Sequence, residues 1–318
     1  MTQPRSVLVT GATGLIGSAL VRLLHAENIP VYCLIRRGSL SKLPPLSGVE
    51  AIEVPTFETE TLRRSLSGIA CDTAFHLASY GVQINDRDRD QLIAGNVGVL
   101  SHVLEAISEH APGKFLYAGS CSEYGFPVKD GQPISEDQPL RPTSLYGAAK
   151  AAAEVYGQAL ALQLKIPFTA LRLFNVFGPE EAPHRLLPSI IQALDQDRPV
   201  DLTGGEQQRD LIHVDDVAGA LLAAARSEKL EPFAAYNVCS GQPVRIREVG
   251  ETAARQMGKP LRLLQWGKLP YRSDEPMWVV GDPTRFQHDT SWHPKMNLTE
   301  GIRSMVAALR NREHQNAV

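Results

Sequence analysis

The sequence predicts an α/β protein built on a doubly wound parallel sheet, with a smaller C-terminal lobe. In the first half of the chain, short β-like runs alternate with longer helical runs, which is typical of a parallel sheet with helices on both faces. A glycine-rich loop joins the first predicted strand to the first predicted helix. After residue 178 the alternation loosens into proline-rich pieces, small helices and isolated strands, and this change predicts the lobe.

Each element of the first half follows from its local pattern of apolar residues. The expected elements are strand 6–10, helix 15–27, strand 31–35, strand 73–78, a helical stretch near 88–110 and strand 114–119. A helix with a strong apolar stripe is expected over 144–164. The run 167–178 then predicts a strand that leaves the sheet for a loop.

The two parts of the chain are expected to interleave, since the sequence contains no clean linker. Residues 1–178 are predicted to form the first domain. Residues 207–240 are expected to return to it, because the runs RDLIHV and AAYNVCS look like sheet elements. The remaining segments, 179–206 and 241–318, are expected to form a substrate-binding lobe.

Composition narrows the classes of partner. The chain has 318 residues, 43% of them hydrophobic, which is enough for a sizeable core. A net charge of -3 without a long basic run argues against nucleic acid as a partner. The N-terminal apolar run is too short for a signal sequence or a membrane span, so we expect no membrane partner and a cytoplasmic location. The four cysteines are scattered without a CxxC motif, so we expect no disulfide and no zinc.

The glycine-rich loop reads TGATGLIG over residues 10–17, with the spacing GxxGxxG. Glycines in such a loop let the backbone approach a pyrophosphate, whose charge is met by amides at the positive end of the next helix. The strand, loop and helix order therefore predicts a Rossmann-like dinucleotide-binding domain. The residues expected to contact the dinucleotide are Gly11, Thr13, Gly14, Leu15, Ile16 and Gly17.

A phenol and an ammonium, those of Tyr146 and Lys150, fall on one face of the predicted helix because they are four residues apart. A nearby ammonium favours the phenolate and lowers the pKa of a tyrosine, which makes Tyr146 the candidate acid and base. Ser120 follows the strand 114–119. At the carboxyl end of a parallel strand, its hydroxyl can hold a substrate oxygen.

Several stretches together resemble the extended short-chain dehydrogenases/reductases, the group of nucleotide-sugar epimerases, dehydratases and reductases. They are TGATGLIG, FHLAS, NVGVL, GSCSEYG, YGAAK, RLFNVFGP, RDLIHVDDVA and WHPKMNLTEGI, and they cover nearly the whole chain. The resemblance implies that Ser120, Tyr146 and Lys150 form the catalytic set, with Tyr146 and Lys150 also at the nicotinamide ribose. It further implies cofactor contacts at Leu77, Ala78, Ser79 and Asn96. It also implies a homodimer formed through the helices around 88–110 and 144–164.

The end of the second predicted strand bears on the cofactor. In NAD-using members of the resembled group, this strand typically ends in an acidic residue that binds the adenosine ribose hydroxyls. Here it runs into Arg36 and Arg37, whose guanidinium groups suit a ribose 2′-phosphate. We therefore expect NADP(H) as the preferred cofactor and NAD(H) as the alternative.

The same resemblance implies a nucleotide-diphosphate sugar as substrate. Asn175 matches a position that contacts the nucleotide diphosphate, and Arg209 matches one that pairs with the diphosphate. Arg272 is expected to be a second clamp, because an arginine fork fits phosphate oxygens. The further residues expected around the substrate are Ser122, Tyr124 and Arg185.

His213, Asp215 and Asp216 do not predict a metal site. His213 falls within a predicted strand, and Asp215 fits the N-cap of the helix that follows. We expect no metal.

The stretch GSCSEYG, residues 119–125, separates the reactions of the resembled group. Its dehydratases need a carboxylate at the position of Ser122, and some carry an aspartate at the position of Cys121. Glu123 is one step later and is expected to face the opposite way. Enzymes that invert C3 and C5 place a cysteine at the position of Ser122 and a histidine where this chain has Arg185. Both reactions are therefore disfavoured, although a loop shift could bring the neighbouring His184 into the position of that histidine.

The hypothesis from the sequence is an NADPH-dependent reductase of a nucleotide-linked 4-keto-6-deoxy sugar, with hydride delivered to C4 and a proton donated by Tyr146. The first alternative is an NAD-dependent 4-epimerase that uses the same three residues. The second is a non-catalytic NADP(H)-sensing protein, since a fold does not fix a function. The intact set of Ser120, Tyr146 and Lys150 favours an enzyme.

Overall fold

A seven-stranded parallel sheet forms the centre of the computed structural model, which describes residues 2–82, 86, 88–125 and 131–316. The strand order is β10-β6-β5-β4-β1-β2-β3, so the order reverses between β1 and β4. The strands are β1 (Val7–Thr10), β2 (Val31–Arg36), β3 (Val49–Val54), β4 (Thr73–His76), β5 (Lys114–Ser120), β6 (Phe168–Leu173) and β10 (Ala235–Val238). The predicted doubly wound parallel fold is confirmed.

The central strands are buried along their whole length, which explains their nearly continuous apolar runs. In the register of the sheet, Thr10 at the end of β1 lies beside His76 at the end of β4. Ligands of such sheets bind outside the carboxyl ends of the strands, where the order reverses. The fold therefore places a binding crevice beyond Thr10 and His76.

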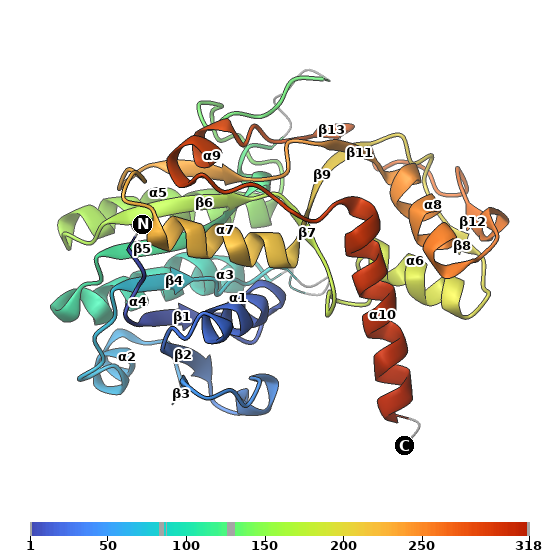
Figure 1. The fold of residues 1–318 in the computed structure, drawn as a ribbon. Coiled ribbons are helices and arrows are strands. Elements are labelled where there is room, and N and C mark those ends of the chain that lie inside the picture. Colours follow the sequence, from blue (N-terminus) through green and yellow to red (C-terminus); the bar gives the residue numbers. More distant parts are fainter. Residues whose placement is uncertain (1, 83–85, 87, 126–130, 317–318) are drawn as a thin grey trace.

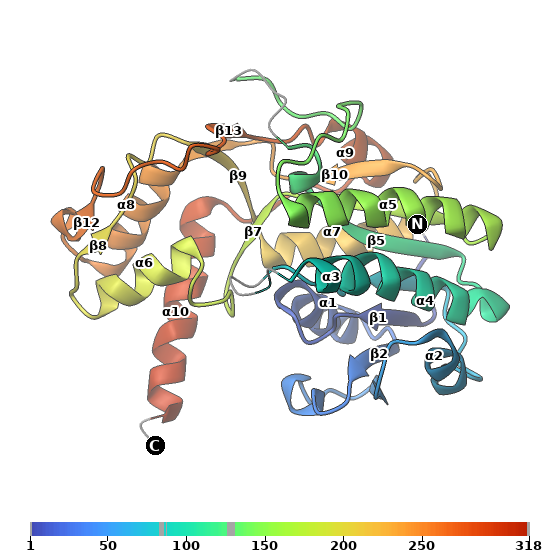
Figure 2. The ribbon, with the colours of Figure 1, turned by 180° about the vertical axis from the view of Figure 1, so that it is seen from behind.

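Helices cover both faces of the sheet (Figures 1 and 2). On one face α1 (Leu15–Ala26) packs against α7 (Val214–Arg226), and on the other α2 (Thr59–Ser65), α4 (Val99–Ile107) and α5 (Leu145–Gln163) share a second apolar cluster. The predicted helical stretch near 88–110 is confirmed. It consists of α3 (Arg89–Ile93), a π-helical turn (Ala94–Gly98), α4 and a short 3-10 helix (Ser108–His110).

The lobe holds small sheets and three helices that enclose a core of their own. Its strands are β7 (Asn175–Phe177), β8 (Val200–Asp201), β9 (Gln208–His213), β11 (Pro243–Arg245), β12 (Leu264–Gln265) and β13 (Trp278–Val279). Its helices are α6 (Leu186–Asp195), α8 (Ile246–Met257) and α10 (Leu298–Asn316). Figure 1 shows α6 and α8 to one side of the main sheet, while α9 (Thr284–Thr290) lies beside β10.

Residues 207–240 do not return to the main sheet as one block, so this part of the predicted boundary is wrong. Strand β9 pairs with β7, β11 and β13 in the lobe, and only α7 and β10 return. The cause lies in β7, which leaves the main sheet and needs a new partner for its backbone groups. It finds that partner in β9, with Asn175 beside Leu211.

Two further properties of the described structure concern membrane-spanning helices and cysteines. In the described part of the chain, no helix is long and apolar enough to cross a membrane. The thiols of Cys33, Cys71, Cys121 and Cys239 are all free.

Candidate active site

The glycine loop lies directly against the turn that follows β4. Gly11 has a φ of +72°, and a Cβ atom there would lie 2.6 Å from the Ala78 nitrogen. The Leu77 N–H donates to the Thr10 carbonyl at 3.2 Å, and the Ala78 N–H donates to Thr10 Oγ1 at 3.3 Å. Only glycine fits this positive φ and close approach. The contact brings Gly11, Leu77 and Ala78 together at the crevice between β1 and β4.

The N-terminus of α1 faces the same crevice without a partner of its own. Gly14 caps the helix without a side-chain acceptor, and the first turn contains no acidic residue. Free amides and the helix dipole favour an anion at this end. A hollow of about 880 Å³, lined by residues 13–15, 41–45 and Glu180, opens beside them. The loop that contains Gly11, Thr13, Gly14, Leu15, Ile16 and Gly17 therefore fits the pyrophosphate of a dinucleotide.

Asn96 supports this crevice from beneath and does not face it. The side chain is 2% exposed. Its Oδ1 accepts hydrogen bonds from Ser79 Oγ at 2.8 Å and from the Tyr80 N–H, and its Nδ2 donates to the Tyr80 and Leu92 carbonyls. All polar groups of this side chain are thus engaged within the protein, and the cofactor contact of Asn96 stays a prediction. Its role in the structure is to fix Ser79, which stays half-buried.

Ser120 and Tyr146 meet at the carboxyl end of β5. Ser120 is the last residue of that strand, and Tyr146 lies in the first turn of α5. The start of α5 can lie this close because Gly147 has no side chain, and a Cβ atom there would lie 2.4 Å from the Ser122 carbonyl oxygen. The hydroxyls of Ser79 and Ser120 both lie close enough to the Tyr146 phenol to lower its pKa. Three hydroxyl groups thus converge on one point.

The sequence led us to expect a lowered pKa for Tyr146, and this expectation is wrong in the structure. Burial, together with a smaller effect of nearby Glu123, raises the pKa of Tyr146 to about 12. The hydroxyls of Ser79 and Ser120 oppose this rise without cancelling it. Tyr146 is therefore a protonated phenol at neutral pH, which suits a proton donor better than a base.

The Lys150 ammonium is held in place by β5. Its Nζ donates a hydrogen bond of 2.6 Å to the Ala118 carbonyl and lies 4.2 Å from the centroid of the Tyr117 ring. Burial lowers the pKa of Lys150 to about 8, while Glu123 and Glu154 favour the charged form. Lys150 therefore loses its charge as the pH rises through about 8.

Tyr124 is part of the core, so its predicted role in the sugar pocket is wrong. The side chain is fully buried. Its hydroxyl donates to Asn237 Oδ1 at 2.7 Å and accepts from Arg172 Nη1 at 2.9 Å. The cause is the 3-10 helix Cys121–Glu123, which turns the chain after β5 and directs Tyr124 inward.

The same 3-10 helix buries Glu123 and leaves Cys121 and Ser122 half-buried. The Ser120 hydroxyl accepts a hydrogen bond from the Ser122 N–H at 3.1 Å, and the Glu123 carboxylate accepts one from the Ser120 N–H at 2.6 Å. Glu123 is thus held in the interior by its own turn. We had expected it to face away because of an extended backbone, whereas the backbone here is a capped helical turn.

The predicted diphosphate clamp is brought together by an acidic residue that the sequence did not single out. Glu275 accepts hydrogen bonds from Arg209 Nη2 at 2.5 Å and from Arg272 Nε at 3.0 Å. Asn175 Nδ2 donates to the Asp210 carbonyl at 2.9 Å, which places the amide next to the strand that carries Arg209. The three residues thus share one region of the lobe.

Arg185 is an exposed residue at the start of α6. Its guanidinium pairs with Glu181 at 3.3 Å, one turn earlier in the chain. Its contact with substrate stays a prediction.

Arg36 is the last residue of β2, and Arg37 follows it at the surface. Both side chains are exposed, and neither forms an ion pair or a side-chain hydrogen bond with the residues that the structure describes. Two free guanidinium groups therefore stand where the sheet presents the adenosine ribose of a dinucleotide.

His213 caps α7, a role that we had expected for Asp215. The ring Nδ1 accepts a hydrogen bond from the Asp215 N–H at 3.3 Å, and Nε2 lies 3.1 Å from Ser304 Oγ. His213 can cap the helix because β9 delivers its side chain directly to the first turn. Within the described ranges, no group of three or more His, Cys, Asp or Glu side chains is placed to hold a metal ion.

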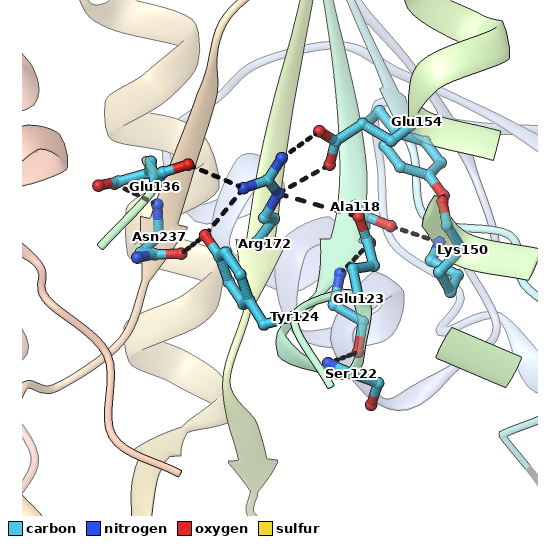
Figure 3. A network of polar contacts seen from close by, with 11 residues as sticks. Ala118, Ser122, Glu123, Tyr124, Glu136, Lys150, Glu154, Arg172 and Asn237 are labelled. Carbon is cyan, nitrogen blue, oxygen red and sulfur yellow. Dashed lines mark hydrogen bonds and ion pairs between the residues drawn. The ribbon is translucent and has the colours of Figure 1, made fainter. Parts of the chain in front are cut away.

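A buried ion pair beneath the site was missed by sequence reasoning. Arg172 in β6 forms a forked pair with Glu154 in α5, with Nε at 3.0 Å and Nη2 at 2.5 Å from the carboxylate oxygens (Figure 3). Two features of the sequence could have indicated this ion pair. Arg172 interrupts the apolar run FTALRL, and Glu154 falls one helical turn after Lys150, on the same face.

These features define a Rossmann-like α/β protein that carries a hydroxyl, a phenol and an ammonium near the carboxyl end of β5. A model of the NAD dependent epimerase/dehydratase family matches residues 7–239, and the chain belongs to that family.

Similar proteins of this family carry out several reactions. The human dTDP-D-glucose 4,6-dehydratase is 25% identical over 98% of this chain and 91% of its own length. The dTDP-6-deoxy-L-talose 4-dehydrogenase (NAD(P)(+)) of Kitasatospora kifunensis is 28% identical over 96% of each chain. The crystal structure of a UDP-glucose 4-epimerase from Thermus thermophilus, in complex with NAD, is 28% identical, with a TM-score of 0.84 over 96% of this chain and 99% of that one.

The glycine loop gives a first prediction. In Gly17→Ala, the new methyl group would lie 2.1 Å from the Gly11 carbonyl oxygen, so the loop must shift and dinucleotide affinity should fall at least tenfold. Titration of the protein with NADPH, followed by nucleotide fluorescence, measures this affinity. Gly98→Ala is the matched control, since a Cβ atom there meets nothing within 4 Å. Equal affinities in the two variants would show that the loop does not hold the dinucleotide.

Proposed function

We propose that the protein is an NADPH-dependent reductase of a nucleotide-diphosphate-linked 4-keto-6-deoxy sugar. The observation that carries the proposal is the free, exposed pair Arg36 and Arg37 at the end of β2. Guanidinium groups bind a 2′-phosphate through charge-assisted hydrogen bonds, and this phosphate distinguishes NADPH from NADH. A net reductase draws NADPH from solution and releases the oxidised form. The similar dehydrogenase from Kitasatospora kifunensis, whose name includes NAD(P)(+), supports this choice.

The turn after β5 supports reduction over elimination. A dehydratase requires a carboxylate near the sugar to remove a proton at C5. The half-buried positions of this turn carry Cys121 and Ser122, while its one carboxylate, Glu123, is buried beneath them. Burial also raises the pKa of the Cys121 thiol to about 12, so this thiol is not a base at neutral pH. The turn therefore supplies no group for proton abstraction from carbon.

The mechanism assigns one task to each residue of the set. When bound, NADPH supplies the hydride for C4 of the sugar. The Ser120 hydroxyl holds the C4 oxygen, and the protonated Tyr146 phenol donates its proton to the alkoxide that forms there. The Lys150 ammonium, fixed at Ala118, stabilises negative charge on the phenolate that remains.

The nucleotide part of the substrate is assigned to the lobe. Arg209 and Arg272 offer two guanidinium groups to the diphosphate, and Glu275 holds them in place by accepting from both. Asn175 is assigned to the same diphosphate.

An NAD-dependent nucleotide-sugar 4-epimerase is the second candidate. The similar epimerase of known structure binds NAD, and Ser120, Tyr146 and Lys150 would serve that reaction equally well. Epimerases of this kind retain NAD and recycle its hydride. The absorbance spectrum of the purified protein separates the two, because retained NAD favours the epimerase. A non-catalytic NADP(H) sensor would have no need for the three residues.

We also propose that the protein is a homodimer formed through α5 and its neighbours. The outer face of α5 carries Leu145, Val155, Tyr156 and Leu162, which are each 53–63% exposed. An apolar stripe of this kind on a surface helix is typical of a protein interface. Figure 2 shows α3, α4 and α5 side by side on this face.

The proposed role of Tyr146 as proton donor is tested by the substitution Tyr146→Phe. Removing a general acid costs about a hundredfold or more in kcat, while NADPH affinity should stay unchanged because the rest of the site is intact. The measurement is NADPH oxidation with GDP-, dTDP-, CDP- and UDP-linked 4-keto-6-deoxy sugars. Turnover that is the same in the variant and the parent would end the proposal of Tyr146 as proton donor.

The cofactor preference is tested by replacing both Arg36 and Arg37 with alanine. Lost hydrogen bonds to a charged phosphate should weaken NADPH binding about tenfold or more and leave NADH binding as it was. Calorimetric titration with each nucleotide measures both affinities. Arg262→Ala, at an exposed position of the lobe, is the control. An equal loss for NADPH and NADH would contradict a 2′-phosphate site.

The dimer is tested by Val155→Glu. A carboxylate in the apolar stripe should convert the protein from a dimer to a monomer of about 35 kDa, the mass of one chain. Size-exclusion chromatography with light scattering gives the mass. Leu261→Glu, at an exposed apolar residue of the lobe, should leave the dimer intact. A monomeric parent protein would refute the interface.

A further inference from the structure

A cluster of four charged side chains lies buried beneath Ser120 and Tyr146. Its members are Glu123 from the 3-10 helix, Lys150 and Glu154 from α5, and Arg172 from β6. Each is no more than 5% exposed. Figure 3 shows Arg172 between Glu154 and Tyr124, with Lys150 beside Ala118.

Two members of the cluster hold the end of β5. Glu123 Oε1 accepts a hydrogen bond of 2.6 Å from the Ser120 N–H, and Lys150 Nζ donates one of 2.6 Å to the Ala118 carbonyl. Ala118 and Ser120 are two residues apart in this strand. The acid and the ammonium are therefore fixed side by side through the backbone that presents the Ser120 hydroxyl.

The second oxygen of Glu123 is left without a hydrogen bond among the described residues. This Oε2 is buried, and its nearest charged partner is Arg172 Nε at 3.9 Å. Arg172 is already engaged by both oxygens of Glu154. Burial and the neighbouring Glu154 raise the pKa of Glu123 well above its usual range, while Lys150 and Arg172 oppose this rise.

The charges of the cluster balance only when Glu123 is counted. The titrations of Glu123 and Lys150 are linked, because the charged form of each favours the charged form of the other. Two acids and two cations cancel when all four are ionised, and a buried charge without compensation is costly. Glu154 is committed to Arg172 by its forked pair. Without Glu123, the Lys150 ammonium would be the one uncompensated charge in the cluster.

The other titratable groups around Glu123 and Lys150 do not provide this compensation. His76 from β4 faces Lys150, and burial lowers the pKa of His76 to about 3, so it is neutral. Tyr117 from β5 and Tyr146 from α5 both face Glu123, and burial keeps both phenols protonated. Cys121, on the same turn as Glu123, is likewise a neutral thiol.

We propose that Glu123 is a positioning residue of the catalytic set, holding the Ser120 backbone and compensating the buried charge of Lys150. It touches neither substrate nor cofactor and acts through these two residues. The inference rests on the proposed function, because it takes Ser120 and Lys150 as catalytic. This role also explains why the 3-10 helix after β5 contains a buried carboxylate that does not face the proposed sugar site.

The test is the titration of Lys150 in Glu123→Gln. Glutamine keeps the size of the side chain and an oxygen for the Ser120 N–H but carries no negative charge. The ammonium then loses a stabilising neighbour, so the midpoint of Lys150 should fall by about one pH unit or more. Side-chain NMR of 15N-lysine-labelled protein measures this midpoint, and Lys150→Arg assigns the signal. The chain contains few lysines, which simplifies the spectrum.

Glu136→Gln is the matched control, at the far end of the same network. Glu136 accepts a hydrogen bond from the Asn237 N–H and contacts Arg172 through its own carbonyl, so its substitution should leave the Lys150 midpoint in place. An unchanged midpoint in Glu123→Gln, or an equal shift in both variants, would overturn the proposal. If Glu123→Gln does not fold, Glu123→Asp gives the same test with a smaller downward shift, because the shorter carboxylate lies farther from Lys150.

A second readout connects the titration to turnover. In the parent protein, turnover that needs the Lys150 ammonium should fall as the pH rises through about 8, and in Glu123→Gln this fall should begin at lower pH. The NMR titration needs no substrate. A shifted midpoint without any reductase activity would therefore refute the proposed reaction and leave the role of Glu123 standing.

Discussion

The forked ion pair between Arg172 and Glu154 is the interaction on which the candidate site depends. It joins β6 to α5, and α5 carries both Tyr146 and Lys150. Because the pair is buried, loss of either partner would leave an uncompensated charge and cost about 3–5 kcal/mol. The same guanidinium holds Tyr124, which fixes the turn after Ser120. One pair of side chains thus sets the distance between the strand and the helix that build the site.

Much of the fold followed from local patterns. The alternation of apolar runs predicted the parallel sheet, and the glycine spacing predicted the turn that Gly11 makes against Ala78. The four-residue spacing of Tyr146 and Lys150 placed both on one face of α5. These predictions succeeded because each depends on residues that are close in the sequence, where periodicity and turn chemistry decide the structure.

Two of the failed predictions depend on partners that are distant in the sequence. Tyr124 is directed inward by the 3-10 helix after β5, and its hydroxyl is held in the core by Asn237 from β10. Strand β9 joins the lobe because β7 needs a partner there. In each case a side-chain direction or a strand pairing was set by tertiary contacts, about which local spacing carries no information.

The central claim, net reduction at C4, is tested most directly by following the hydride. NADPH that carries deuterium at C4 of the nicotinamide ring is incubated with the protein and the 4-keto-6-deoxy sugar nucleotide that it turns over, and the product is examined by NMR. Net reduction places one deuterium at C4 of the sugar for each NADP+ released. A product without deuterium, formed by protein that retains tightly bound NAD, would contradict it and identify the epimerase.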